Sequence, residues 1–217
     1  TDLSLHLNKG EFVTVIGSNG AGKSTLFNAI AGSFYVDAGA ITVGGHNMTF
    51  LPEYKRAKRI GRLFQDPLKG TAPNMTIEEN LALAAGNGSW CSRLTQKDRT
   101  RFRDGLEERM RQPGGLLSGG HRQALTLLMA TLVPPKLLLL DEHTAALDPG
   151  TAEKVLELTK RIVAEGNITC LMVTHNMQQA LELGTRTLMM ADGRIVLDVS
   201  GADRAGMTVE DLIHRFK

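Results

Sequence analysis

The sequence is poor in cysteine, in long apolar runs and in charge of one sign. Only Cys91 and Cys170 occur among its 217 residues, which excludes a disulfide framework and a four-cysteine zinc site and fits the reducing cytoplasm. The longest strongly apolar stretches, around 125–133 and 137–140, are far shorter than the roughly 18 to 20 residues that a membrane span requires. With 25 basic and 23 acidic residues the formal net charge is +2, so we expect no nucleic-acid partner.

The remaining composition is that of one compact domain. Hydrophobic residues make up 42% and charged residues 22%, which argues against disorder. A length of 217 residues predicts one full-sized domain with room for an inserted subdomain. The chain opens on residues 1–5 in a strand-like pattern and without a targeting segment. We therefore expect an N-terminal strand region to be truncated upstream of Thr1.

Strand-like and helix-like segments alternate along most of the chain. Periodicity predicts helices at 23–31, 151–165 and 176–183, and a final helix capped by Thr208 and ending at Phe216. Short β-rich runs lie before and between them, at 12–16, 40–43, 61–64, 137–140, 168–173, 187–190 and 195–199. Alternation of this kind predicts an α/β fold with a mostly parallel sheet.

The middle of the chain follows a different pattern. Residues 76–133 contain no convincing strand, and Thr76 with Glu79 forms a capping box that opens a helix. We interpret the region of about 66–133 as a helical subdomain inserted into a core made of 1–65 and 134–217. Glycine pairs inside the insertion mark breaks between its helices rather than a linker between independent domains.

Residues 17–24 match the phosphate-loop pattern GxxxxGKS between a predicted strand and a predicted helix. Glycines let successive backbone N–H groups face one concavity, and the following helix adds its positive dipole end. In this pattern Lys23 reaches the outer phosphates and Ser24 offers a hydroxyl to Mg²⁺. A structural turn is the alternative, but this string in this context arises rarely by chance. The loop predicts a P-loop NTPase.

Two carboxylates follow the apolar run at 137–140. Such a run is typical of a central parallel strand, whose carboxyl end is where open α/β sheets bind ligands. Asp141 is expected to hold Mg²⁺, directly or through water. Glu142 is then placed to orient and deprotonate an attacking water. A helix-capping or surface role is the alternative for the pair.

The string Leu-Ser-Gly-Gly-His-Arg-Gln at 117–123 decides between P-loop families. It resembles the LSGGQ signature of ATP-binding cassette (ABC) ATPases, and further motifs follow in the family's order. Gln65 resembles the Q-loop glutamine, Asp148 in Ala-Ala-Leu-Asp the D-loop aspartate, and His175 the switch histidine. The resemblance covers essentially the whole chain.

This resemblance implies a set of site residues. ATP is expected at Gly17, Ser18, Asn19, Gly20, Ala21, Gly22, Lys23, Ser24 and Thr25, and Mg²⁺ at Ser24, Gln65 and Asp141. The catalytic groups are Glu142, His175 and Gln65. In the family, the signature of one subunit closes over ATP held by its partner. Carried over, Ser118, Gly119, Gly120, His121 and Asp148 bind ATP in trans across a head-to-tail dimer.

The chain departs from the family pattern at two histidines. His121 replaces the usual signature glutamine with a group that titrates near neutral pH, and His143 follows Glu142 where many relatives have proline. The string at 141–149, DEHTAALDP, resembles a group of bacterial uptake ATPases proposed to import tryptophan or tyrosine. The aromatic residue that stacks on adenine in the family would lie upstream of Thr1, so Phe34 and Tyr35 are interpreted as packing residues.

The resemblance also implies partners. We expect an ATP-hydrolysing subunit of an importer, forming a homodimer or pairing with another ABC subunit at the cytoplasmic face of the cell membrane. It would drive separate permease subunits, with a substrate-binding protein delivering the cargo. The alternative is an ABC-type ATPase of repair, translation or cluster assembly, while a small-molecule kinase has no use for the signature. The basic cluster Lys55, Arg56, Lys58 and Arg59 is interpreted as a solvated face.

Overall fold

A computed structural model describes residues 2–86 and 106–216, so Cys91 lies outside the described residues. Contacts divide the chain into two compact units. The core unit comprises Thr1–Arg62, Lys136–Glu142 and Val163–Lys217, and the helical unit comprises Leu63–Pro135 and His143–Ile162. The helical unit contains the region 66–133 and adds residues 143–162, which follow the two carboxylates.

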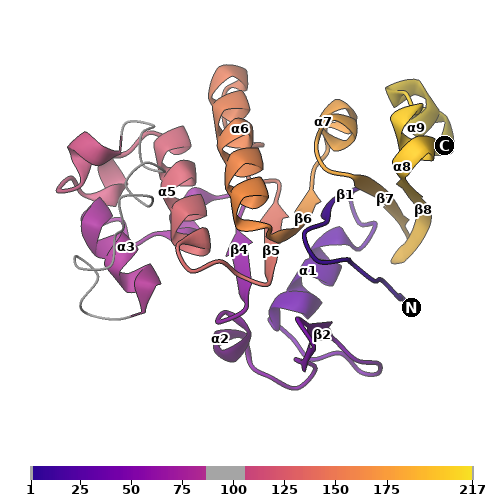
Figure 1. Cartoon of the computed structure of the whole chain (residues 1–217), viewed down its shortest axis with the longest axis horizontal. Helices are drawn as coiled ribbons and strands as arrows, with labels where there is room; N and C mark the ends of the chain where they lie inside the picture. The colour runs from indigo at the N-terminus through magenta and orange to yellow at the C-terminus, as the bar shows by residue number, and fades with distance from the viewer. Residues whose placement is uncertain (1, 87–105, 217) are drawn as a thin grey trace. The chain divides into compact units, whose positions relative to one another are not determined.

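A six-stranded sheet runs in the order β4-β5-β6-β1-β7-β8 (Figure 1). Strand β1 pairs in parallel with β6 and β7, β5 pairs in parallel with β6, and β7 and β8 are antiparallel. The α/β class with a mostly parallel sheet is therefore confirmed. The strands are β1 Phe12–Gly17, β4 Ile60–Leu63, β5 Leu137–Asp141, β6 Thr169–Val173, β7 Arg186–Ala191 and β8 Arg194–Ser200.

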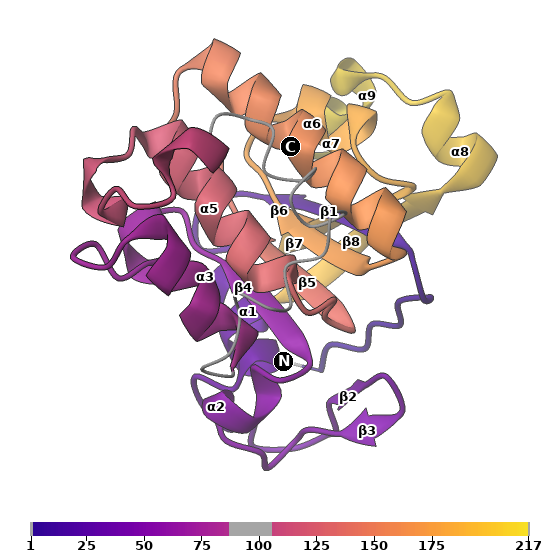
Figure 2. The ribbon, with the colours of Figure 1, turned by 60° about the vertical axis from the view of Figure 1, so that its left-hand side comes forward.

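Two expected strands turned out differently. Residues 2–7, which the structure describes, belong to no strand, so the strand-like reading of the first residues is wrong. The segment 40–43 forms only the two-residue β2, Thr42–Val43, which pairs with β3, His46–Asn47, in a hairpin outside the main sheet (Figure 2). Gly44 and Gly45 both have positive φ, which suits a tight hairpin turn.

The helices of the core unit are α1 Lys23–Ala31, α2 Glu53–Arg56, α7 Met177–Glu182, α8 Gly201–Ala205 and α9 Val209–Phe216. Side chains fix several of their starts. Asn176 caps α7 by accepting from the N–H of Gln179, and Thr208 caps α9 by accepting from the N–H of Asp211. Helix α6, Pro149–Gly166, begins in the helical unit and ends in the core unit.

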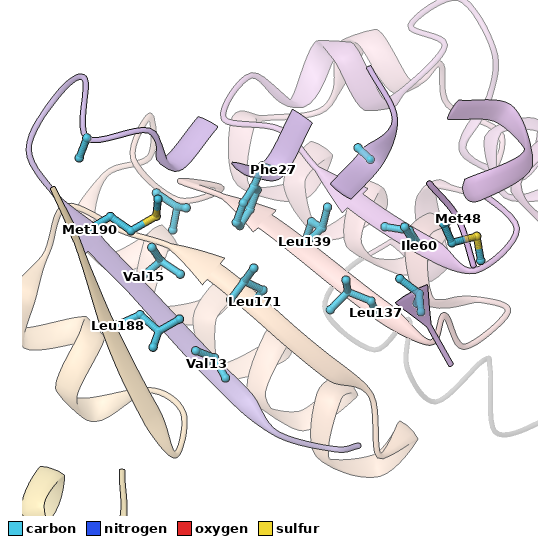
Figure 3. Packing of buried hydrophobic residues seen from close by; sticks show 14 residues of the cluster. Val13, Val15, Phe27, Met48, Ile60, Leu137, Leu139, Leu171, Leu188 and Met190 are labelled. Atoms are coloured by element: carbon cyan, nitrogen blue, oxygen red, sulfur yellow. The ribbon is translucent and has the colours of Figure 1, made fainter. Parts of the chain in front are cut away.

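Alternation along β1 separates two hydrophobic clusters. Val13 and Val15 belong to the larger cluster, where Phe27 of α1 lies among strand side chains that include Leu139 and Leu171 (Figure 3). Ile16 belongs to a smaller cluster with side chains of α7 and α9. The larger cluster anchors α1 to the sheet and so fixes the loop between β1 and α1.

The basic cluster at 55–59 is not wholly solvated, because Arg56 is fully buried. Its guanidinium donates to four backbone carbonyls: those of Ala29 and Ile30 at the end of α1, and those of Thr49 and Leu51. Burial lowers the pKa of Arg56 from its usual value. The interpretation of this residue as part of a solvated face was wrong, since it serves as an internal cap for α1.

Two aromatic residues after α1 were also misjudged. Phe34 is 42% exposed and Tyr35 is 55% exposed, so neither is an ordinary packing residue.

Within the described residues, no helix combines the length and the apolar character needed to span a membrane.

The helical unit contains α3, Ile77–Ala85, and α5, Gly119–Thr131, with short 3-10 helices at Pro67–Gly70, Glu107–Arg109 and Gly114–Leu116. The expected capping box is confirmed, with Thr76 and Glu79 each bonding the other's backbone N–H. Among the described residues of 76–133, strand-type pairing is limited to an isolated bridge between Thr76 and Pro113. The inserted helical subdomain of the predicted fold is confirmed.

Candidate functional site: a phosphate loop and a signature helix

The loop between β1 and α1 has the backbone of a phosphate cradle. Gly20 and Gly22 take φ values of +83° and +97°, a region that side chains with a Cβ rarely adopt. A Cβ on Gly22 would also lie 3.1 Å from Cα of Gly193. Among the described residues no side chain caps α1, so its first N–H groups face the loop. Uncapped N–H groups at a helix start suit an anion.

The side chain of Lys23 folds back onto the backbone of this loop. Its side chain is 6% exposed, and Nζ donates to the carbonyl oxygens of Gly17 at 2.7 Å and Ser18 at 2.9 Å. Burial lowers the pKa of Lys23, and the nearby carboxylates of Glu142 and Asp141 partly oppose that shift. The ammonium thus lies beside the loop backbone and within the field of both carboxylates, where a bound phosphate would be neutralised.

The two carboxylates leave the carboxyl end of β5 in different directions. Asp141 is the last residue of β5 and pairs with Val173 of β6. Glu142 has φ of +48° and donates its N–H to Val173, a conformation unusual for a residue with a side chain. This turn places Glu142 Oε1 2.5 Å from Nε2 of His175. Strained backbone at the end of a central strand is typical of functional sites.

Arg62 contacts Asp141 and was missed by sequence reasoning. Its Nη2 lies 3.6 Å from Asp141 Oδ2 and donates to Asn28 Oδ1 of α1 at 2.7 Å. The side chains of Arg62 and Asp141 are only 13% and 19% exposed. The guanidinium therefore holds this carboxylate beside the phosphate-loop helix. No local pattern indicates this contact, because Arg62 lies in β4, far along the chain from both partners.

The core unit offers hard oxygen ligands that suit Mg²⁺. Ser24 is exposed at the start of α1, and Asp141 ends β5. Among the described residues, no group of three or more His, Cys, Asp or Glu side chains could form a metal cage. Mg²⁺ commonly takes one or two protein ligands and completes its shell with water and substrate phosphates, so a hydroxyl with one carboxylate fits it.

In the helical unit, the signature string forms the start of α5. Ser118 caps the helix, accepting from the N–H of His121 at 3.4 Å, and its Oγ lies 2.7 Å from His121 Nδ1. A Cβ on Gly120 would collide with Cγ2 of Thr151, so glycine allows α6 to pass close to this helix end. The result is an exposed hydroxyl at a helix N-terminus, a second surface suited to an anion.

Two further predicted residues are exposed in the helical unit. Asp148 caps α6 by accepting from the N–H of Thr151 at 3.1 Å, and this bonding lowers the pKa of Asp148. Gln65 is exposed just after β4, and the preceding residue, Phe64, accepts a hydrogen bond at its carbonyl from Gln123 of α5. That bond links the Q-loop segment to the signature helix.

His143, the second histidine that departs from the family pattern, is buried and not exposed to a bound nucleotide. It is 1% exposed, its Nε2 lies 3.2 Å from Thr159 Oγ1 of α6, and burial lowers its pKa to about 4. Its Nδ1 has no hydrogen-bond partner among the described residues. The ring is therefore neutral at physiological pH and contacts α6.

The predicted residues form two groups, one in each unit. The core unit contains the phosphate loop, Asp141, Glu142 and His175. In it the carboxylate of Asp141 pairs with Arg62 and that of Glu142 with His175. The helical unit contains Gln65, the signature residues and Asp148.

Comparisons with known proteins agree with this arrangement. The ABC transporter family model matches residues 1–145. A tyrosine transport ATP-binding protein of Clostridioides difficile is 45% identical, the match covering 100% of this chain and 90% of that protein. The high-affinity branched-chain amino acid transport ATP-binding protein BraG of Pseudomonas aeruginosa is 35% identical over 93% of this chain and 86% of its own length.

A solved structure supports the same assignment. A dimeric ATP-binding cassette in a post-hydrolysis state, bound to ADP and Pi, superposes with a TM-score of 0.74 and 26% identity, covering 92% of this chain and 89% of that one. The fold of this chain is thus that of an ATP-binding cassette. The chain belongs to the ABC transporter family and is a transporter subunit that binds and hydrolyses ATP.

Proposed function

We propose that this ATPase works as a dimer that encloses two nucleotides and drives uptake through separate permease subunits. The phosphate loop, residues 17–25, would hold the phosphates of one ATP in the core unit. The signature of the partner subunit would close over the same nucleotide. The observation that carries this proposal is that one chain presents two helix starts suited to anions, α1 and α5, in different units.

The chemical step follows from the core unit. Water would attack the γ-phosphorus while the Glu142 carboxylate takes its proton, and the bond to the bridging oxygen would break with its electron pair leaving on ADP. His175, 2.5 Å from Glu142, would orient that carboxylate and reach the γ-phosphate. Lys23 would stabilise charge on the outer phosphate oxygens.

Mg²⁺ would be held by Ser24 and Asp141 of the core unit together with the nucleotide. When bound, the ion supplies charge neutralisation across the β- and γ-phosphate oxygens. Arg62 keeps the Asp141 carboxylate beside α1 through its ion pair and its bond to Asn28. The position of this metal ligand is thereby fixed by the chain itself.

In the helical unit, Ser118, Gly119, Gly120 and His121 would contact the partner's nucleotide from the start of α5. Asp148 would lie at the same dimer interface. The partner is a second copy of this chain or a paired ABC subunit. The Oγ of Ser118 contacts His121 and the carboxylate of Asp148 accepts from Thr151, both within the first turn of a helix, and both residues are exposed, which supports an approach to a nucleotide on another subunit.

We propose import as the direction of transport, with a substrate-binding protein delivering cargo to permease subunits and this chain bound at the cytoplasmic face of the membrane. Support comes from the 45% identity to a tyrosine transport ATP-binding protein. Tyrosine or a related aromatic amino acid is therefore the first cargo to test, in vesicles that contain this chain together with candidate permease subunits.

The variant Ser118→Arg tests the dimer. A bulky cation at the signature would occupy the place of the partner's phosphate while leaving the phosphate loop of its own chain intact. We expect unchanged ATP affinity by equilibrium titration and loss of hydrolysis. Ser33→Arg, outside both helix starts, is the control that should keep turnover. Native turnover by Ser118→Arg would contradict the enclosed-nucleotide dimer.

A further inference from the structure

The signature turn contains a hydrogen bond between a serine hydroxyl and a histidine ring. A glutamine at the histidine position could not change the direction of this bond by gaining a proton. His121 Nδ1 lies 2.7 Å from Ser118 Oγ, and the backbone N–H of His121 points to the same oxygen at 3.4 Å. Both partners lie in the first turn of α5, and Ser118 is exposed. The hydroxyl assigned to the partner's phosphate is therefore bonded to an imidazole.

The direction of this bond depends on the proton carried by the ring. When Nδ1 lacks a proton, the hydroxyl donates to it, and the oxygen of Ser118 turns its lone pairs outward. When Nδ1 carries a proton, as it always does in the charged ring, Nδ1–H must donate to Oγ, and the hydroxyl hydrogen is free to bond elsewhere. A phosphate oxygen is an acceptor, so only the second arrangement offers it the Ser118 proton.

We propose that His121 is a positioning residue whose protonation decides whether Ser118 donates a hydrogen bond to the nucleotide of the partner subunit. The inference rests on the proposed function, since it requires the signature to contact that nucleotide. It makes assembly of the hydrolytic dimer sensitive to pH in the range where imidazoles titrate, with closure favoured on the acid side.

Charged groups lie near this turn on its own helix and on the segment packed against it. Gly119 and Gly120 approach Leu147 and Thr151, so the turn packs on the segment that carries Asp148. Asp148 is bonded to Thr151 and is also near Lys154. On α5 itself, the Arg122 guanidinium donates to the carbonyls of Gly114, Gly115 and Leu117.

Two measurements test the proposal. Long-range ¹H–¹⁵N NMR of the native chain without nucleotide should show the neutral His121 ring protonated at Nε2, and Ser118→Ala should change that tautomer balance. The ATPase rate at saturating Mg-ATP should then be compared between the native chain and His121→Gln from pH 8 to pH 6. The native-to-variant ratio should rise roughly tenfold, the worth of a hydrogen bond to a charged group.

The control is His46→Gln, whose ring bonds the carbonyl of Gly44 in the core unit. Its ratio to the native rate should stay flat with pH. A flat ratio for His121→Gln, or a tautomer balance unmoved by Ser118→Ala, would overturn the inference. If Ser118→Arg hydrolyses ATP normally, the proposed dimer fails; if that variant is inactive while the His121→Gln ratio is flat, only the role of His121 fails.

Discussion

The two units differ in how their functional groups are held. In the core unit the groups of the site contact one another: Lys23 bonds the loop backbone, Glu142 pairs with His175, and Arg62 pairs with Asp141. In the helical unit Ser118 and Asp148 are exposed, and each is hydrogen-bonded within the start of its own helix. This difference fits the proposal that the core unit binds and hydrolyses ATP while the helical unit contacts the nucleotide of a partner subunit.

If each unit has the proposed role, substitutions in the two units should affect ATP binding and ATP hydrolysis separately. Changes in the phosphate loop should weaken ATP binding, whereas changes at the signature should leave binding intact and stop hydrolysis. Changes at buried residues behind either site should act on stability. The following substitutions test each part of this division.

Glu142→Gln should have the largest effect. Glutamine keeps the size of the side chain but cannot take a proton from water, so we expect the hydrolysis rate to fall by roughly 10² to 10⁴. Loss of a negative charge beside the phosphates also favours ATP binding. The variant should therefore accumulate as an ATP-bound dimer, measured by size-exclusion chromatography with light scattering. Glu157→Gln, on the exposed side of α6, is the matched control. A variant that stays monomeric in saturating ATP would make Glu142 a bystander.

Lys23→Ala should remove nucleotide binding. The ammonium supplies charge-assisted hydrogen bonds, and we expect ATP affinity to fall roughly a hundredfold or more, because such bonds are worth most where burial excludes water. Titration with fluorescent ATP measures the affinity, and circular dichroism checks that the fold persists. Lys9→Ala, at an exposed position, is the control. Undiminished affinity of Lys23→Ala would contradict the phosphate-loop assignment.

Arg56→Met should destabilise the core unit without touching the site. It leaves carbonyls at the end of α1 without their donor, so the free energy of unfolding should fall by about 3 kcal/mol or more. Urea unfolding measures the loss. Arg204→Met is the matched comparison, because Arg204 caps the end of α7 in the same way but is only partly buried, and a smaller loss is expected. Equal losses would show that burial does not set the cost.

His143 should make the protein sensitive to acid. Its pKa is lowered to about 4 in the folded chain, so the unfolded chain takes up its proton first as the pH falls. The stabilisation is fully present above about pH 6.5 and is lost between there and pH 4, by about 3 kcal/mol at most. His143→Asn keeps a hydrogen-bonding group without titrating. Urea unfolding at several pH values should show a shallower acid loss for this variant, and parallel curves would refute the assignment.

The sequence predicted the fold where pattern and motif agree. Short apolar runs located β1, β5 and β6, helical spacing located α1, and the capping box at Thr76 and the cap at Thr208 depend only on local spacing. Contacts between distant segments gave no such signal. The burial of Arg56, the pairing of Arg62 with Asp141 and the neutral His143 each depend on tertiary packing, where charge patterns along the chain mislead.

At the candidate site, local spacing likewise predicted which residues belong to motifs but not how they contact one another. It identified Lys23, Glu142 and His175 as motif residues, but the contact between Glu142 and His175 requires the positive φ at Glu142, which follows from the end of β5 meeting β6. The bond between Ser118 and His121 was within reach, since residues three apart share a helix face and Ser118 is the cap.

Mixing two inactive variants tests the central claim most directly. Lys23→Ala retains an intact signature, and Ser118→Arg retains an intact phosphate loop, so a dimer of one with the other contains one complete composite site. Each variant alone should be inactive, and hydrolysis should appear when they are mixed, rising with the fraction of mixed dimer. If the mixture hydrolyses no more ATP than the two variants measured separately, the nucleotide is not shared between the phosphate loop of one chain and the signature of the other.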